Sequence, residues 1–163
     1  MPGGAPSASV GRVRGMTGVA MDLLVATDFS PHGKAVLRVA HRFAKALGAK
    51  VWIVHVVTPA AWPRLPDADG AAAAVGLEEE RRLVEEAASA LRLEGVDAAG
   101  LTVEGPPVKT LLEEAARLEA DMIIVGSHGY GRVARALLGS VSAGLVRQAA
   151  CPVLVVPVRG EER

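Results

Sequence analysis

The chain has 163 residues, of which 50% are apolar and only 3% aromatic, so one domain with an aliphatic core is expected. Its formal net charge is zero, which argues against a dedicated nucleic-acid surface. Cys151 is the single cysteine, so no internal disulfide can form and a cytoplasmic location fits. No apolar run approaches the roughly 20 residues that a membrane span needs.

The two ends of the sequence differ in composition from the rest. Residues 1–20 are rich in Gly, Ala, Ser and Pro and contain no acidic residue. We expect a disordered N-terminal tail there, in which Met16 or Met21 is a candidate native start. We also expect a short C-terminal tail over residues 159–163. One domain would then cover residues 21–158.

Strand and helix patterns alternate through that domain. Apolar runs predict five strands, at residues 22–27, 51–57, 98–104, 121–125 and 153–158. Between them, apolar residues at helical spacing predict four helices. The expected buried faces are Val36, Val39, Ala40, Phe43 and Leu47, then Val84, Ala88 and Leu91, then Val108, Leu111, Leu112, Ala115 and Leu118, and last Val141, Leu145 and Ala149.

Local signals mark where the elements begin and end. Ser30 is a candidate N-cap with Pro31 at the first helical position, and Gly48 is suited to the C-terminal end. An irregular stretch at residues 58–76 precedes a second helix, expected to begin near Leu77 and to carry a solvated face of Glu and Arg residues. The fourth helix is expected from about Ser140.

The order of the elements predicts the fold class. Alternating strands and helices, with strands apolar on both faces, are typical of an α/β protein: a five-stranded parallel sheet between two helical layers. Pro157 removes a ladder donor, which predicts that the last strand lies at an edge. Ligands of such sheets bind outside the carboxyl ends of the strands. Asp28, the end of the second strand at Val56, and the loop after the fourth strand fall there.

That last loop is rich in glycine and predicts a phosphate site. Gly126, Gly129 and the later pair Gly139-Ser140 surround Arg132, which can neutralise phosphate charge. Backbone N–H groups in such a loop, together with a helix N-terminus, favour anions. For Asp28, two readings stay open: a turn-forming residue, or a carboxylate that contacts ribose.

Other chemistries fit the sequence less well. A G-x-G-x-x-A match begins at Gly129, but it follows the fourth strand and the acidic residue of a dinucleotide site is missing downstream. Lys109-Thr110 resembles the end of a P-loop without its glycines. The four histidines have no paired ligand spacing, so no metal site is predicted. His41 and His55 are assigned structural or surface roles, and no catalytic residue is identified.

The residues resemble the universal stress protein family. Its G-x2-G-x9-G-S signature is met by Gly126, Gly129, nine intervening residues and Gly139-Ser140. The similarity extends to Thr27–Ser30, His55-Val56 and residues 151–156. It implies the Rossmann-like, adenine nucleotide alpha hydrolase-like fold with sheet order 3-2-1-4-5. It also implies a homodimer paired through the strand Val153–Val158.

The resemblance further implies ATP, ADP or AMP as ligand. By position, the nucleotide-binding residues would be Ala26, Asp28, Val56, Val125, Gly126, Gly129, Arg132, Gly139, Ser140, Val141 and Ser142. Asp28 would contact ribose and the Val56 backbone would face adenine. The residues from Gly139 to Ser142 would hold phosphates, with Mg²⁺ carried by the phosphates. Ala26 departs from the family, in which ATP-binding members often carry proline.

We therefore expect an adenine-nucleotide-binding stress or signalling module with an unknown protein partner. It is not expected to be an efficient enzyme, because no water-activating base accompanies the phosphate donors. One alternative is a slow Mg²⁺-dependent ATPase or nucleotide-transferring enzyme. Another is a nucleotide-free dimeric interaction protein in which the glycines only connect elements.

Overall fold

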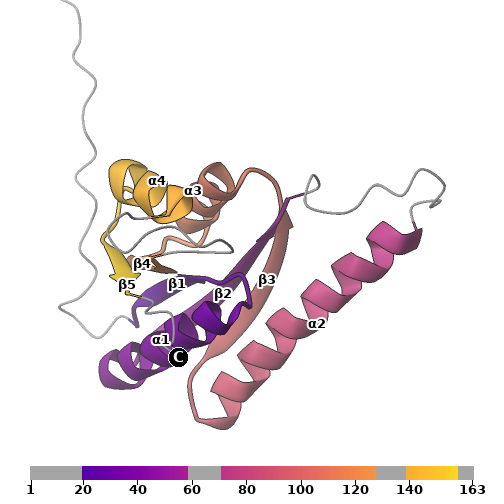
Figure 1. Cartoon of the computed structure of the whole chain (residues 1–163). Coiled ribbons are helices and arrows are strands. Elements are labelled where there is room, and N and C mark those ends of the chain that lie inside the picture. Colours follow the sequence, from indigo (N-terminus) through magenta and orange to yellow (C-terminus); the bar gives the residue numbers. More distant parts are fainter. Residues whose placement is uncertain (1–19, 59–70, 128–138, 158–163) are drawn as a thin grey trace, which may run out of the picture.

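A computed structural model describes residues 20–58, 71–127 and 139–157 of the chain. Within these ranges, five parallel strands form one sheet in the order β3-β2-β1-β4-β5, with helices on both faces (Figure 1). The predicted fold class is confirmed. In chain order the elements are β1 (Asp22–Ala26), α1 (Pro31–Leu47), β2 (Lys50–Val57), α2 (Ala71–Leu93), β3 (Ala98–Glu104), α3 (Pro107–Arg117), β4 (Met122–Gly126), α4 (Ser140–Gln148) and β5 (Val153–Val156).

The first helix begins and ends at the residues predicted for it. The Ser30 hydroxyl accepts a hydrogen bond from the Gly33 N–H at 3.2 Å, and Pro31 opens the helix. Gly48 follows its end with φ 61°, a left-handed conformation that costs glycine little, and its N–H donates to the Ala44 carbonyl. These caps fix the path from β1 into α1.

Alternate residues of the strands supply two hydrophobic cores, one on each face of the sheet. Leu23 and Val25 of β1 pack in the core under α1 and α2. Leu24 and Ala26 pack in the core under α3 and α4. This alternation follows from the two-residue period of a strand, and it leaves β1 buried on both faces.

Two glycines let helices approach their neighbours closely. A Cβ at Gly100 would lie 2.4 Å from a Val84 methyl group, so α2 sits directly on β3. A Cβ at Gly144 would lie 2.7 Å from a Val108 methyl group at the contact of α3 with α4. The positions of α2 on β3 and of α4 against α3 therefore depend on the absence of a side chain in glycine.

The expected start of α2 near Leu77 is wrong, because the helix begins at Ala71. Alanine has the highest helix propensity of any residue type. The run of alanines at the start of α2 therefore outweighs the low helix propensity of the neighbouring glycines. The expectation of an irregular stretch at residues 58–76 is corrected accordingly. Most of that stretch, residues 59–70, lies outside the described ranges.

The buried face of α1 also differs from the expected one. Val36 and Ala40 are buried as predicted, but the third buried position is Ala44. Phe43 and Leu47 are 36% and 46% exposed and line an open hollow of about 840 Å³ on the outside of the helix. Small residues at positions 40 and 44 draw the helix close to the sheet and turn the larger side chains outward. The predicted faces of the other helices pack into the two cores, except that Val108 lies at the contact of α3 with α4 instead.

The edges of the sheet agree with the sequence prediction for the last strand. β5 lies at one edge and ends at Val156, directly before Pro157. β3 forms the opposite edge. Among the helices that the structure describes, none combines the length and apolarity required to cross a membrane. Both expected tails, except Ala20 at the end of the first, lie outside the described residues.

Candidate functional site

The middle of the sheet is its topological switch point. β1 leads into α1, which packs on one face, and the neighbouring β4 precedes α4, which packs on the other. The helices that follow these two neighbouring strands therefore lie on opposite faces of the sheet (Figure 1). In open parallel sheets this is where ligands bind.

The central strand β1 stops before both of its neighbours. Its last register pairs are Ala26 with Val54 of β2 and Val25 with Ile124 of β4. β2 continues to Val57, however, and β4 continues to Gly126. The two flanking strands thus extend beyond the last pairs that they make with β1.

The direction of the backbone groups on these extensions follows from the ladder. Lys50 N–H donates toward β1 and the Val54 carbonyl accepts from Thr27 N–H, so even-numbered residues of β2 direct their N–H and C=O groups toward β1. Val56 therefore points its backbone groups to the β1 side. The N–H groups of Ile123 on β4 and of Ser127 directly after it donate to the Pro152 and Val156 carbonyls on the β5 side, so Gly126 points to the β1 side as well. We call the backbone groups of Val56 and Gly126 the terminal rung.

Asp28 stands at the start of the turn from β1 to α1. Its Oδ1 accepts hydrogen bonds from Ser30 N–H at 3.1 Å and from the Ser30 hydroxyl at 2.7 Å. Its Oδ2 is buried and has no hydrogen-bond partner among the described residues. Asp28 is thus both the turn-forming residue and the owner of an unsatisfied buried acceptor, so the two readings from sequence are compatible.

Three predicted contact residues share the face of the sheet under α3 and α4. Ala26 and Val125 are buried and Val56 is half-buried, and all three pack in the same core with Val141. The structure therefore brings together an apolar surface from three adjacent strands and the first turn of α4.

The N-terminus of α4 is joined to the end of β4. Gly139 N–H donates to the Ser127 carbonyl at 2.7 Å, which holds the two predicted parts of the glycine signature together. Ser140 is exposed at the first position of α4. Ser142 is 1% exposed, and its hydroxyl lies 3.2 Å from the Ser127 carbonyl and 3.0 Å from the Gly139 carbonyl. Its assignment to phosphate binding stays a prediction.

Two predicted residues cannot be placed. Gly129 and Arg132 lie outside the described residues, as does His128. Across residues 20–58, 71–127 and 139–157, no three His, Cys, Asp or Glu side chains converge in a way that could hold a metal ion.

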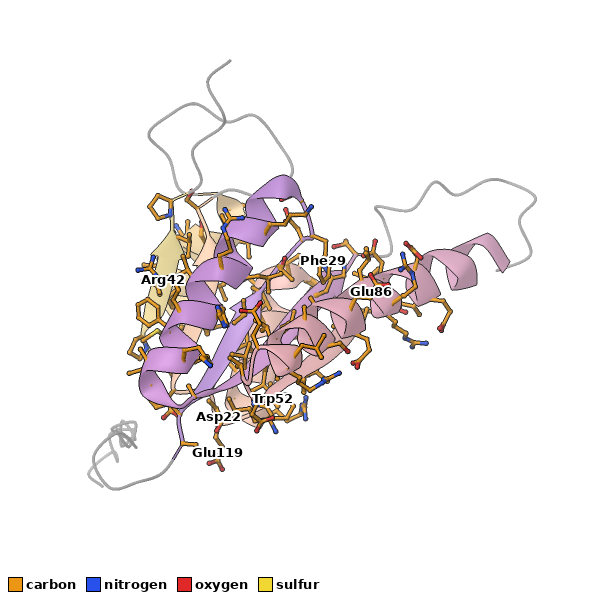
Figure 2. The ribbon with its side chains drawn as sticks, turned by 90° about the horizontal axis from the view of Figure 1, so that it is seen from below. Asp22, Phe29, Arg42, Trp52, Glu86 and Glu119 are labelled. Atoms are coloured by element: carbon orange, nitrogen blue, oxygen red, sulfur yellow. The ribbon has the colours of Figure 1, made fainter. Side chains whose placement is uncertain are left out.

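His55 is a site-adjacent residue whose role the sequence did not indicate. Its Nδ1 lies 2.8 Å from the Thr27 carbonyl, and its Nε2 lies 3.2 Å from Glu80 Oε2 on α2. Its ring packs on Phe29, with 5.4 Å between the ring centroids. Figure 2 shows Phe29 near α1 and α2, at the end of the molecule opposite Asp22 and Trp52. The sequence signal that could have indicated this role is a polar residue within an otherwise apolar strand, directly before Val56.

Among the described residues, the ion pairs that shift pKa values lie away from this site. Arg82 lowers the pKa of Glu79 on the exposed face of α2, and Arg92 lowers the pKa of Glu85 there. These pairs are solvent-exposed, so they form the solvated helix face that the sequence predicted. Cys151 packs at the margin of the core under α3 and α4, and burial raises the pKa of its thiol.

Comparisons with known proteins agree on one family. A model described as "Universal stress protein family" matches residues 21–157. A universal stress protein of Thermus aquaticus is 34% identical over 140 residues, covering 82% of this chain and 96% of the relative. A universal stress protein of Mycobacterium tuberculosis is 41% identical over 112 residues, covering 64% of this chain but 37% of the relative.

Solved structures show the same fold. A universal stress protein in complex with cAMP is 30% identical, with a TM-score of 0.63, and the match covers 85% of this chain and 97% of that one. A universal stress protein from Archaeoglobus fulgidus in complex with dAMP is 24% identical, with a TM-score of 0.58 and coverage of 83% and 96%. The second similarity concerns the fold alone.

Proposed function

The chain belongs to the universal stress protein family, and from this premise we propose that it binds an adenine nucleotide beside the terminal rung. The ligand is ATP, or its products ADP and AMP, and the protein acts as a stress-response signalling module. The domain that does this covers residues 21–158.

The observation that carries the proposal is the unsatisfied carboxylate oxygen of Asp28. A buried acceptor without a partner costs free energy, so native structures normally provide one. Oδ1 is already occupied by Ser30, which leaves Oδ2 for a ligand donor. The hydroxyl groups of ribose are such donors, and the position of Asp28 at the switch point fits a nucleotide sugar.

The surrounding residues fit the remaining parts of a nucleotide. The Val56 N–H and C=O form a donor and acceptor pair that complements the N1 and N6 edge of adenine. Ala26 and Val125 supply an apolar wall for the base. Gly139 and the exposed Ser140 open a helix whose N-terminus favours phosphate, and Val141 and Ser142 follow in the same turn. We assign Gly126, Gly129 and Arg132 to the phosphate path.

Support also comes from the 30% identical relative, whose structure is a complex with cAMP. That ligand contains the base, the ribose and a phosphate. An adenine ligand for the present chain is thus consistent with its relative. ATP as the ligand is the finer part of our proposal, and it rests on the full glycine signature, which resembles that of the ATP-binding members of the family.

We propose a binding switch rather than an efficient enzyme. A nucleotide can shift the protein between conformations only by its differential affinity for them. The switch would act in the cytoplasm as a homodimer joined through Val153–Val158, with Mg²⁺ carried by the phosphates. Slow hydrolysis remains the alternative that a single-turnover assay with ATP and Mg²⁺ distinguishes.

The proposal is tested by nucleotide extraction and by titration calorimetry with ATP, ADP and AMP. We expect binding by the wild-type protein and at least about tenfold weaker binding by Asp28→Asn, because a hydrogen bond to a charged acceptor is lost. Asp97→Asn, on the exposed loop before β3, is the matched control and should bind normally. An empty extract together with no titration heat for all three nucleotides would overturn the proposal.

A further inference from the structure

The pairing of β1 with β2 ends abruptly at Thr27. In a regular parallel ladder, Thr27 N–H donates to Val54 and the Thr27 carbonyl then accepts from Val56 N–H. The first of these bonds is present at 3.2 Å, but the register stops at the pair Ala26 and Val54. The Thr27 carbonyl instead faces the imidazole of His55.

The hydrogen on His55 Nδ1 follows from this contact. A carbonyl oxygen can only accept, so at 2.8 Å the imidazole Nδ1 carries the hydrogen and donates it. The imidazole therefore bonds the oxygen that the next ladder step would offer to Val56 N–H, and no hydrogen bond from Val56 N–H to this oxygen is present. Because adjacent strand residues direct their backbone groups to opposite sides, the His55 backbone faces β3 while its neighbour Val56 faces the β1 side.

Two neighbours hold the ring in this position. Glu80 Oε2 on α2 lies 3.2 Å from Nε2, at the far end of the imidazole. Phe29, which has a left-handed φ of 53°, packs against the ring with the two ring planes tilted by 54°. The His55 side chain is 12% exposed, so little room remains for another orientation. The turn at Thr27 is closed further by its own hydroxyl, which accepts from Phe29 N–H at 3.1 Å.

We propose that His55 is a positioning residue that keeps the Val56 N–H available to a ligand. By taking the Thr27 carbonyl, its imidazole stops the ladder one step early and leaves the Val56 backbone facing the site. The role in base recognition rests on the proposed function, whereas the capture of the carbonyl does not. His55 touches no ligand itself, and it acts through Thr27 and Val56.

The first test is amide hydrogen exchange, which needs no nucleotide. In the wild-type protein without nucleotide we expect the Val56 amide to exchange at least about tenfold faster than that of Val54, which keeps its pairing. His55→Leu removes the donor, so Val56 should recapture the Thr27 carbonyl and become protected. His55→Asn keeps a side-chain N–H close to the Nδ1 position and nearly matches leucine in shape, so Val56 should stay unprotected.

The second test is the affinity for AMP against that for ribose 5-phosphate, which lacks the base. His55→Leu should weaken AMP binding about tenfold, the loss of one hydrogen bond, and leave ribose 5-phosphate binding unchanged. His55→Asn should restore most of the AMP affinity. A merely structural role would weaken both ligands equally. His41→Leu is the control variant, because it removes the other histidine beside a glutamate, 3.1 Å from Glu94, far from the site.

The outcomes separate the two proposals. Equal protection of Val56 and Val54 in the wild-type protein would overturn the role of His55, and so would equal losses for AMP and ribose 5-phosphate. If His55→Leu does not fold, the wild-type exchange comparison and the behaviour of His55→Asn still decide. Wild-type protein that fails to bind AMP, but shows the expected exchange pattern, would overturn only the proposed function.

Discussion

Cys151 illustrates how the surroundings of a residue decide its chemistry. Thiolate is the reactive form of cysteine, and the half-buried position of Cys151 next to the apolar core disfavours that charge. Burial therefore raises the pKa of the thiol.

This environment predicts slow alkylation. At pH 8 we expect iodoacetamide to modify Cys151 of the folded protein several-fold more slowly than in urea, because less thiolate is present. A raised pKa means that the folded protein retains the thiol proton to higher pH, so the folded rate should keep rising with pH after the unfolded rate has levelled off. Mass spectrometry over a time course measures both rates. Equal rates at pH 8 would contradict the burial.

At the site, the sequence predicted residues whose role depends on local chemistry. Asp28 and the glycine signature could be proposed as binding residues from the sequence alone. A carboxylate directly after a strand, or glycines directly before a helix, suggests a ligand contact without knowledge of any distant neighbour. For His55 the sequence indicated only a structural or surface role, because its contact with the Thr27 carbonyl joins residues that are remote in sequence. The burial of Ser142 likewise depends on the contact between α4 and the end of β4.

Among the elements, α4 presents two serines in opposite directions. Ser140 is exposed at the start of the helix, whereas Ser142 is buried against the Ser127 and Gly139 carbonyls. Both carbonyls keep a backbone N–H donor if the Ser142 hydroxyl is removed, from Gly139 and Ala143 respectively. The hydroxyl is therefore a supplementary tie between α4 and β4.

We expect Ser142→Ala to lower the free energy of unfolding by about 1 kcal/mol, the worth of one buried hydrogen bond. Ser140→Ala should leave it unchanged, because its side chain is exposed. Urea denaturation without nucleotide measures both values. With nucleotide, Ser140→Ala should weaken ATP more than adenosine, which has no phosphate. A larger stability loss in Ser140→Ala than in Ser142→Ala would reverse these assignments.

The pattern of apolar residues predicted the nine elements that the described residues form, and every strand end agrees within two residues. The two failures have physical causes. Alanine carries no apolar period, so the start of α2 at Ala71 had no signal in the pattern. The spacing of apolar residues also cannot show which side of the apolar face of α1 packs on the sheet. The small residues Ala40 and Ala44 pack there, and Phe43 is turned outward.

For the whole molecule, the edge strand β5 is the surface that the proposed dimer requires. The carbonyls of Pro152 and Val156 accept from β4, so even-numbered residues of β5 face inward and Val153 and Val155 direct their backbone groups to the open edge. No strand among the described residues pairs with this edge, and an edge of apolar residues is suited to pairing with a second copy.

Val155→Pro should therefore convert the proposed dimer into a monomer, because proline removes an outward N–H and leaves the inward ladder intact. Leu154→Pro is the contrasting variant: it removes an inward-facing N–H and should lower the melting temperature. Analytical ultracentrifugation gives the mass, and circular dichroism confirms the fold. A folded Val155→Pro dimer would show that β5 is not the contact, and a wild-type monomer would remove the dimer altogether.

The early end of β1 has a mechanical consequence. Beyond Ala26, the sheet continues as two separate strand pairs, β2 with β3 and β4 with β5, which β1 no longer connects. A molecule bound to both Val56 and Gly126 would connect these two strand pairs at the centre of the sheet. Loading and unloading of the site would then change the stiffness of the sheet itself, and a change in stiffness reaches β5 without any helix having to move.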